Sequence, residues 1–140
     1  MKSSRKKKLF GGCTLLLTLT LFFLSLSSFS QTLTFCESVD NNGNPKGSSS
    51  KFTINATGGF LEGLVTLPRE VNSASATYDI FKVDEENKEV FESTIKQNLK
   101  PQFTWFSQRI TFHKTGTYHV YVYDDRDRLL CVGVVAIRIQ

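Results

Sequence analysis

The sequence predicts an all-β fold, an antiparallel sandwich of about seven to nine short strands, for residues 31–140. Apolar residues there alternate with polar ones at a period of two, or form short continuous runs. Clusters of Gly, Asn, Asp, Ser and Pro separate these runs at short intervals. No segment shows a convincing helical pattern. Many short strands with frequent turn signals are typical of sandwiches and barrels.

The first 30 residues have the composition of a secretory signal peptide. "MKSSRKKK" is basic, residues 9–24 are apolar, and Ser28 and Ser30 fit the small-x-small rule for cleavage. We therefore expect a cut between Ser30 and Gln31, which leaves one domain over residues 31–140. The alternative is a retained membrane anchor, because residues 9–29 are long enough to cross a bilayer.

Charge gives no support for a nucleic-acid partner. The whole chain carries 17 basic and 13 acidic residues. Five of the basic residues, and none of the acidic ones, lie in the first 30 positions, so residues 31–140 carry 12 basic and 13 acidic residues, a net charge of −1. The basic character belongs to the export signal, and we expect neither nucleic acid nor an anionic membrane surface as partner.

The expected strands of the first half cover residues 32–36, 51–56 and 60–67. Residues 40–50, rich in Asn, Gly and Ser, predict a loop. Gly58 and Gly59 predict a turn or bulge, and Pro68 ends the third strand. Phe52 and Ile54 share one face of the second strand because side chains alternate.

The second half predicts further strands at residues 76–83, 90–94, 102–106, 109–113, 117–123 and 129–139. In the first of these, Tyr78, Ile80 and Lys82 have the same parity. "DEENKE" (residues 84–89) predicts a polar turn, and "DDRDR" (residues 124–128) a hairpin loop.

The segment "FHKTGTYHVYVYD" resembles the penultimate strand of bacterial immunoglobulin-like and PKD-like domains, which often run G-x-Y-x-V-x-V and end in Asp. The resemblance implies an immunoglobulin-like sandwich. It implies structural roles for Gly116, as the turn glycine, and for Tyr118, as a tyrosine corner whose hydroxyl bonds to backbone upstream. Lys114 stands where the family often has an acid, and Val120 where antibody domains have a cysteine. The match covers mainly the C-terminal hairpin.

Cys36 and Cys131 are the only cysteines of residues 31–140. Two cysteines in an exported protein predict a disulfide. The first and last strands of immunoglobulin-like sandwiches commonly lie side by side, which would bring the pair together. The alternative is two buried free thiols.

The strand at residues 117–123 suggests a binding surface. Its two faces carry Tyr118, Val120 and Val122 on one side and His119, Tyr121 and Tyr123 on the other. The solvent face of an antiparallel sheet is usually polar, so an aromatic outer face suggests a partner, either protein or glycan. The alternatives are cover by a loop or by the first strand, or tyrosines on ordinary sheet surface.

Catalytic and metal-binding motifs are lacking. The two histidines, His113 and His119, have no third ligand at a recognised spacing. The acids at 124, 125 and 127 alternate with arginines and lack the spacing of a calcium loop. "NAT" at Asn55 fits a glycosylation sequon. We expect no catalytic residue, metal or cofactor.

These observations predict an exported, non-enzymatic binding or scaffolding module of the cell envelope, secreted or periplasmic. It would contact the membrane only if the signal is retained. Two alternatives remain. One is a structural accessory subunit of an envelope complex, and the other is a small hydrolase with an unrecognised site.

Overall fold

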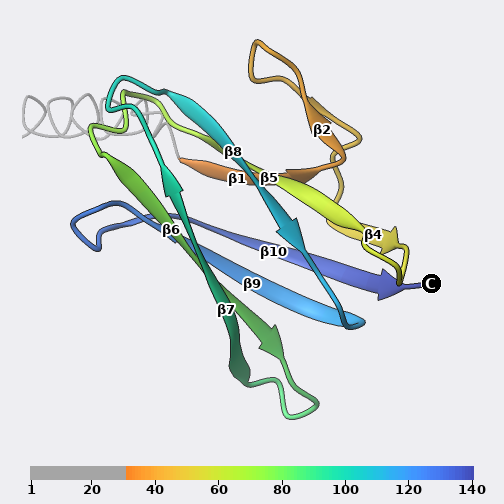
Figure 1. Ribbon diagram of the computed structural model, residues 1–140. Coiled ribbons are helices and arrows are strands. Elements are labelled where there is room, and N and C mark those ends of the chain that lie inside the picture. Colours follow the sequence, from red (N-terminus) through yellow and green to blue (C-terminus); the bar gives the residue numbers. More distant parts are fainter. Residues whose placement is uncertain (1–30) are drawn as a thin grey trace, which may run out of the picture.

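The computed structural model describes residues 31–140 as two β-sheets packed face to face (Figure 1). The signal peptide, its cleavage site and the alternative anchor fall outside the described residues. One sheet has the order β1 (Thr32–Cys36), β5 (Phe60–Thr66) and β8 (Trp105–Thr111). The other has the order β4 (Lys51–Ile54), β10 (Leu129–Ile139), β9 (Gly116–Tyr123), β6 (Ser75–Val83) and β7 (Glu89–Asn98). A short pair, β2 (Ser38–Val39) and β3 (Pro45–Lys46), makes a third sheet.

This arrangement confirms the predicted all-β, immunoglobulin-like sandwich. Strands β10, β9 and β6 are neighbours in the larger sheet, as the last, penultimate and third main strands are in immunoglobulin folds, with β7 added at the edge. Within residues 31–140 every strand pairing is antiparallel except that of β4, which runs parallel to β10. No helix long and apolar enough to cross a membrane occurs within residues 31–140.

Two predicted strands, at residues 102–106 and 109–113, are one strand in the structure. Ser107 and Gln108 suggested a break, but the ladder between β8 and β5 continues through both, opposite Leu64 and Gly63. The loop predicted at residues 40–50 contains β3. The strand predicted at residues 90–94 is also longer, since β7 runs over Glu89–Asn98.

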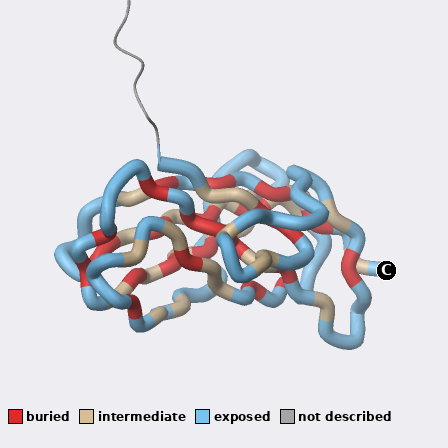
Figure 2. Tube along the Cα trace, turned by 90° about the horizontal axis from the view of Figure 1, so that it is seen from above, coloured by how far each residue is buried: buried red, intermediate tan, exposed pale blue. Residues whose placement is uncertain are grey.

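The core lies between the two sheets and is built largely from alternate residues of β6, β9 and β10 on one side and from residues of β1, β5 and β8 on the other (Figure 2). In β9, for example, Tyr118, Val120 and Val122 are buried while their neighbours are partly exposed. The alternation of side chains along β9 in the sequence therefore identifies which of them enter the core.

The sheets approach most closely where β1 crosses β10. A Cβ added to Gly133 would lie 2.7 Å from the ring of Phe35 and 2.8 Å from Leu33. These distances are too short for any side chain, so glycine at this position lets two strands of different sheets pack against each other.

A chain of hydrogen bonds joins the two sheets through the interior. The hydroxyl of the fully buried Tyr78 on β6 donates to Gln97 Oε1 on β7 at 2.7 Å. Gln97 Nε2 then donates to the carbonyl of Ser107 on β8 at 2.8 Å. Every polar atom of this chain of contacts has a partner, which is what burial of such groups requires.

Three hairpins use the same turn, each opening with an aspartate. Asp40, Asp84 and Asp124 each accept backbone N–H bonds at one carboxylate oxygen from the residues two and four positions later. The residue three positions later has a positive φ in each: Gly43 at 82°, Asn87 at 65° and Asp127 at 60°. Residues that tolerate this conformation, Gly, Asn and Asp, occupy it.

Candidate functional site

Tyr118 has the structural role that the resemblance implied. Its side chain is 2% exposed, its ring packs against Phe112 at a centroid distance of 4.7 Å, and its hydroxyl donates to the carbonyl of Lys114 at 2.7 Å. This last bond is a tyrosine corner. Burial raises the pKa of the Tyr118 phenol. Gly116 differs from the expectation, because it begins β9 rather than lying in the turn.

His119, Tyr121 and Tyr123 point away from the core, as parity predicted. All three are partly exposed on the outer surface of the five-stranded sheet. Tyr121 lies opposite Asp79 of β6 and Val132 of β10 in the strand register. The structure therefore places the three predicted binding residues together on one surface.

Glu89, the first residue of β7, binds two of these side chains and was missed in the sequence. His119 Nδ1 lies 2.5 Å from Glu89 Oε1, and the Tyr121 hydroxyl donates to the same oxygen. The Tyr121 hydrogen bond, with that of His119, lowers the pKa of Glu89. The same hydrogen bond raises the pKa of Tyr121. The carboxylate therefore fixes the orientation of both aromatic side chains.

Two phenylalanines extend the aromatic surface towards the sheet edge. Phe81 meets Tyr121 edge to face at a centroid distance of 5.5 Å, and Phe91 meets Phe81 similarly at 5.7 Å. Phe91 is 57% exposed. The register of neighbouring strands puts Val134, His119, Phe81 and Phe91 in one row across four strands.

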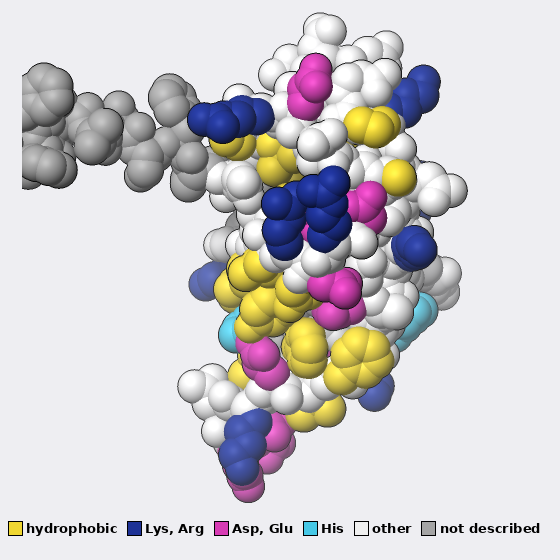
Figure 3. Space-filling model, turned by 90° about the vertical axis from the view of Figure 1, so that its left-hand side faces the viewer, with side chains coloured by type: hydrophobic (Ala, Val, Ile, Leu, Met, Phe, Trp, Pro, Cys, Tyr) yellow, Lys and Arg dark blue, Asp and Glu magenta, His cyan; other side chains and the backbone are white. Residues whose placement is uncertain are grey.

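We call this surface the outer face, and define it by Phe81, Glu89, Phe91, His119, Tyr121, Tyr123, Val132 and Val134. Val134 is 53% exposed, so the apolar character continues onto β10. In Figure 3, hydrophobic side chains gather in the lower part of the view, beside acidic ones. A contiguous set of exposed aromatic and aliphatic side chains is typical of an interaction surface.

The predicted disulfide does not form: Cys36 and Cys131 are both free and buried. The first and last strands do pack against each other, with Gly133 of β10 against Phe35 of β1, but they belong to different sheets. Cys131 lies in the core. Cys36 follows the inward-facing Phe35 and so points to the opposite side of its sheet, with its Sγ 3.6 Å from the carbonyl of Glu62.

Neither thiol is set up for nucleophilic chemistry. Burial, reinforced by the charge of Glu62, raises the pKa of Cys36. Burial raises the pKa of Cys131 to about 12. The thiolate is the reactive form, and burial disfavours it in both side chains.

The remaining candidate residues lie apart from one another. His113 is exposed between β8 and β9, and Asn55 is exposed in the turn after β4, where its side-chain oxygen accepts from Thr57. Asp124 is not the solvated tip residue expected, since it is 3% exposed. Within residues 31–140, no group of three His, Cys, Asp or Glu side chains is placed to hold a metal ion.

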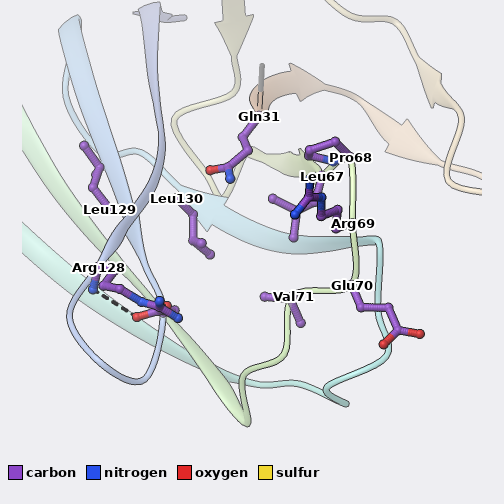
Figure 4. Close-up of a pocket in the computed structure, with 10 residues that line it drawn as sticks. Gln31, Leu67, Pro68, Arg69, Glu70, Val71, Arg128, Leu129 and Leu130 are labelled. Carbon is purple, nitrogen blue, oxygen red and sulfur yellow. Dashed lines mark hydrogen bonds and ion pairs between the residues drawn. The ribbon is translucent and has the colours of Figure 1, made fainter. Parts of the chain in front are cut away.

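A concave feature, which we call the end cleft, opens at one end of the sandwich (Figure 4). It has a volume of about 930 Å³ and lies between the loop after β5 and the hairpin between β9 and β10. Its lining residues are Gln31, Leu67, Pro68, Arg69, Glu70, Val71, Asp124, Arg128, Leu129 and Leu130. Sequence reasoning did not find this cleft, because loops separated by more than fifty positions build it.

No protein-family model and no curated protein matches this chain in sequence. Solved structures do match in shape. An immunoglobulin-like protein from Pseudomonas aeruginosa is 13% identical, with a TM-score of 0.49 over 79% of this chain and 94% of that chain. A superoxide reductase (neelaredoxin) from Ignicoccus hospitalis is 9% identical, with a TM-score of 0.43 over 80% of this chain and 81% of that chain. The immunoglobulin-like assignment follows from this chain's own strand order and tyrosine corner.

Proposed function

We propose that this protein is an exported, non-enzymatic binding module of the cell envelope that recognises a partner protein through the outer face. The observation that supports this proposal is the row of exposed and partly exposed aromatic and aliphatic side chains across four adjacent strands. Aromatic residues are enriched in protein interfaces because they bury large areas and carry polar tips.

Preorganisation of the outer face supports the same proposal. Glu89 holds His119 and Tyr121, and Phe81 packs against the edge of the Tyr121 ring. Side chains that are already ordered lose less entropy on binding, so more of the contact energy appears as affinity. A glycan partner would use the same rings for stacking, and the experiment below distinguishes the two.

The test compares a double variant, Tyr121→Ser with Tyr123→Ser, with the wild type and with Phe60→Ser. Phe60 is an exposed aromatic residue of the other sheet, where it stacks on Arg109, and serves as the matched control. Each tagged protein is incubated with envelope extract, and retained proteins and glycans are quantified by mass spectrometry. The leading candidate is then purified, and its affinity for each variant is measured.

We expect one partner protein to bind the wild type and the Phe60 variant equally and to bind the double variant at least tenfold more weakly, with no loss of thermal stability. Equal binding by the double variant would show that the outer face is ordinary sheet surface. Retention of a glycan and not of a protein would contradict a protein partner and would show that the outer face recognises carbohydrate.

A structural accessory role is a second candidate, favoured by the free edge of β7. Among the strands of residues 31–140, β7 pairs with β6 alone, and its backbone groups on the other side are available to a further strand. A bulge near Phe91 and the charges of Glu92 and Lys96 oppose unspecific edge pairing. An accessory subunit would copurify with its complex in a fixed ratio, whereas a recognition module would bind its partner reversibly and in no fixed ratio.

A further inference from the structure

The end cleft has the dimensions of a small-molecule site and is not part of the outer face. Its volume of about 930 Å³ lies within the usual range for ligand pockets, roughly 300–1,000 Å³. Leu67 and Val71, both buried, supply apolar wall from the loop after β5, and Leu130 supplies it from β10. An apolar ligand segment would find contacts on two sides.

The two walls are tied together, so the cleft exists before any ligand binds. The backbone N–H of Asp125 donates to Ser73 Oγ at 3.0 Å, and the N–H of Ala74 donates to Asp125 Oδ2 at 3.0 Å. Ser73 is itself almost fully buried. These bonds join the loop after β5 to the hairpin between β9 and β10.

The polar part of the cleft centres on Arg128. Asp124 is held by the backbone N–H groups of Arg126 and Arg128, each at 2.9 Å, and accepts from Arg128 Nε at 2.9 Å. The carboxylate therefore fixes the guanidinium through one nitrogen. No acceptor among the described residues bonds its two terminal nitrogens, and its side chain is 62% exposed.

A second guanidinium, that of Arg69, lines the other side of the cleft (Figure 4). The carboxylate of Glu70 is directed away from the other lining side chains in the same view. Of the three donors to Asp124, only the Arg128 guanidinium is charged, so these two groups form an ion pair. The polar groups directed towards a ligand are therefore the terminal N–H donors of Arg128 and the guanidinium of Arg69.

We propose that the end cleft binds a small organic carboxylate that carries an apolar chain. The carboxylate accepts from the terminal nitrogens of Arg128 and from Arg69, and the chain lies against Leu67, Val71 and Leu130. Arginine is suited to this role because its planar fork matches both oxygens of a carboxylate. The apolar wall adds affinity in proportion to the chain buried.

Sodium octanoate is the probe that tests this proposal, with 1-octanol as the neutral analogue and octylammonium as the cationic one. Each is titrated below its aggregation concentration into the protein as isolated from producing cells, and methyl resonances are followed by NMR. We expect saturable shifts at Leu67, Val71 and Leu130 with octanoate. Octanol should bind about tenfold more weakly, since it lacks the charge-assisted hydrogen bonds, and octylammonium weaker still.

Substitution of single arginines tests whether their charge, and not the fold, accounts for octanoate binding. Arg69 is exposed and makes no side-chain hydrogen bond or ion pair within residues 31–140, so Arg69→Gln should weaken octanoate binding about tenfold without loss of thermal stability. Arg128→Gln should weaken binding at least as much, and it also removes the bond to Asp124. Arg109→Gln, on the other sheet, is the matched control and should change nothing. Octanol binding as tightly as octanoate, octanoate binding unaffected by Arg69→Gln, or shifts confined to the outer face would each overturn the proposal.

Discussion

Tyr118 combines packing with a hydrogen bond that fixes the start of β9. Truncation to alanine removes the ring from its contact with Phe112 and leaves a cavity between the sheets. We expect Tyr118→Ala to lower the free energy of unfolding by about 3–5 kcal/mol. Tyr118→Phe keeps the ring and loses only the bond to Lys114, which should cost about 1 kcal/mol. Urea denaturation of the two variants measures both values, and similar losses would show that the hydroxyl dominates.

Asp124 makes stability depend on acid pH. Burial pushes the pKa of its carboxyl up, but the backbone N–H bonds from Arg128 and Arg126 and the Arg128 guanidinium outweigh burial and lower the pKa. A carboxyl with a lower pKa when folded stabilises fully above its unfolded pKa, about 3.9, and this contribution is lost as the pH falls through the folded value.

The corresponding experiment is thermal unfolding of wild type and Asp124→Asn between pH 7 and pH 2. Asparagine keeps one acceptor oxygen and cannot titrate, so the variant should be less stable at pH 7 and its melting temperature should fall less on acidification. Parallel curves for the two proteins would show that Asp124 contributes nothing to the acid dependence. Asp40 and Glu89, whose pKa values are also lowered, remain as background in both proteins.

At the scale of the elements, Gly133 sets how closely β1 can lie on β10. A methyl group there would enter the space of Phe35 and Leu33, both of which pack against the core. We expect Gly133→Ala to destabilise by about 1–3 kcal/mol through overpacking, although alanine favours strand conformation no less than glycine. Pairing this change with Leu33→Ala makes room for the methyl group. If the pair of substitutions is simply additive in urea denaturation, the close contact is not the cause.

Strand positions were predictable where the pattern of apolar residues was clear and turn-forming residues marked a strand end. Residues 32–36 and 129–139 match β1 and β10 in full, because β1 alternates polar and apolar residues and β10 is a long apolar run that follows the polar turn at residues 124–128. The sequence predicted β8 as two strands because Ser107 and Gln108 are polar. In the structure these two residues continue the strand because they pair with β5. Edge strand β7 is exposed over most of its length, so its apolar and polar residues do not alternate in a way that would mark the strand.

The outer face was predictable only in part, because sequence pattern reveals the side-chain alternation within a strand but not the pairing between strands. Parity alone placed His119, Tyr121 and Tyr123 on one face. Glu89 and Phe91 reach that face only because β7 pairs with β6, a partnership that no local pattern encodes. The cysteine pairing failed at this level too, since β1 and β10 belong to different sheets and Cys36 points away from the core that holds Cys131.

At the scale of the whole molecule, the interior hydrogen bonds from Tyr78 through Gln97 to Ser107 hold the sheets together on the side where β7 and β8 lie. Gln97→Ala would leave the buried Tyr78 hydroxyl without a partner, and we expect a loss of about 1–3 kcal/mol. Tyr78→Phe removes the same hydroxyl. In the double variant the second change should therefore cost much less than it does alone, and full additivity in a double-mutant cycle would disprove the coupling.

The parallel pairing of β4 with β10 fixes the order in which the fold can be completed. β4 is among the first strands to be synthesised, and β10 is the last. Until β10 is in place, β4 has no strand to pair with, and the buried side chain of Ile54 has no sheet to complete. Contacts between such distant segments carry a large loop-closure cost, and topologies of this kind fold on the order of milliseconds to seconds. β4 must therefore remain unpaired until β10 is added, whereas β1 can already pair with β5, so this edge of the larger sheet is completed late.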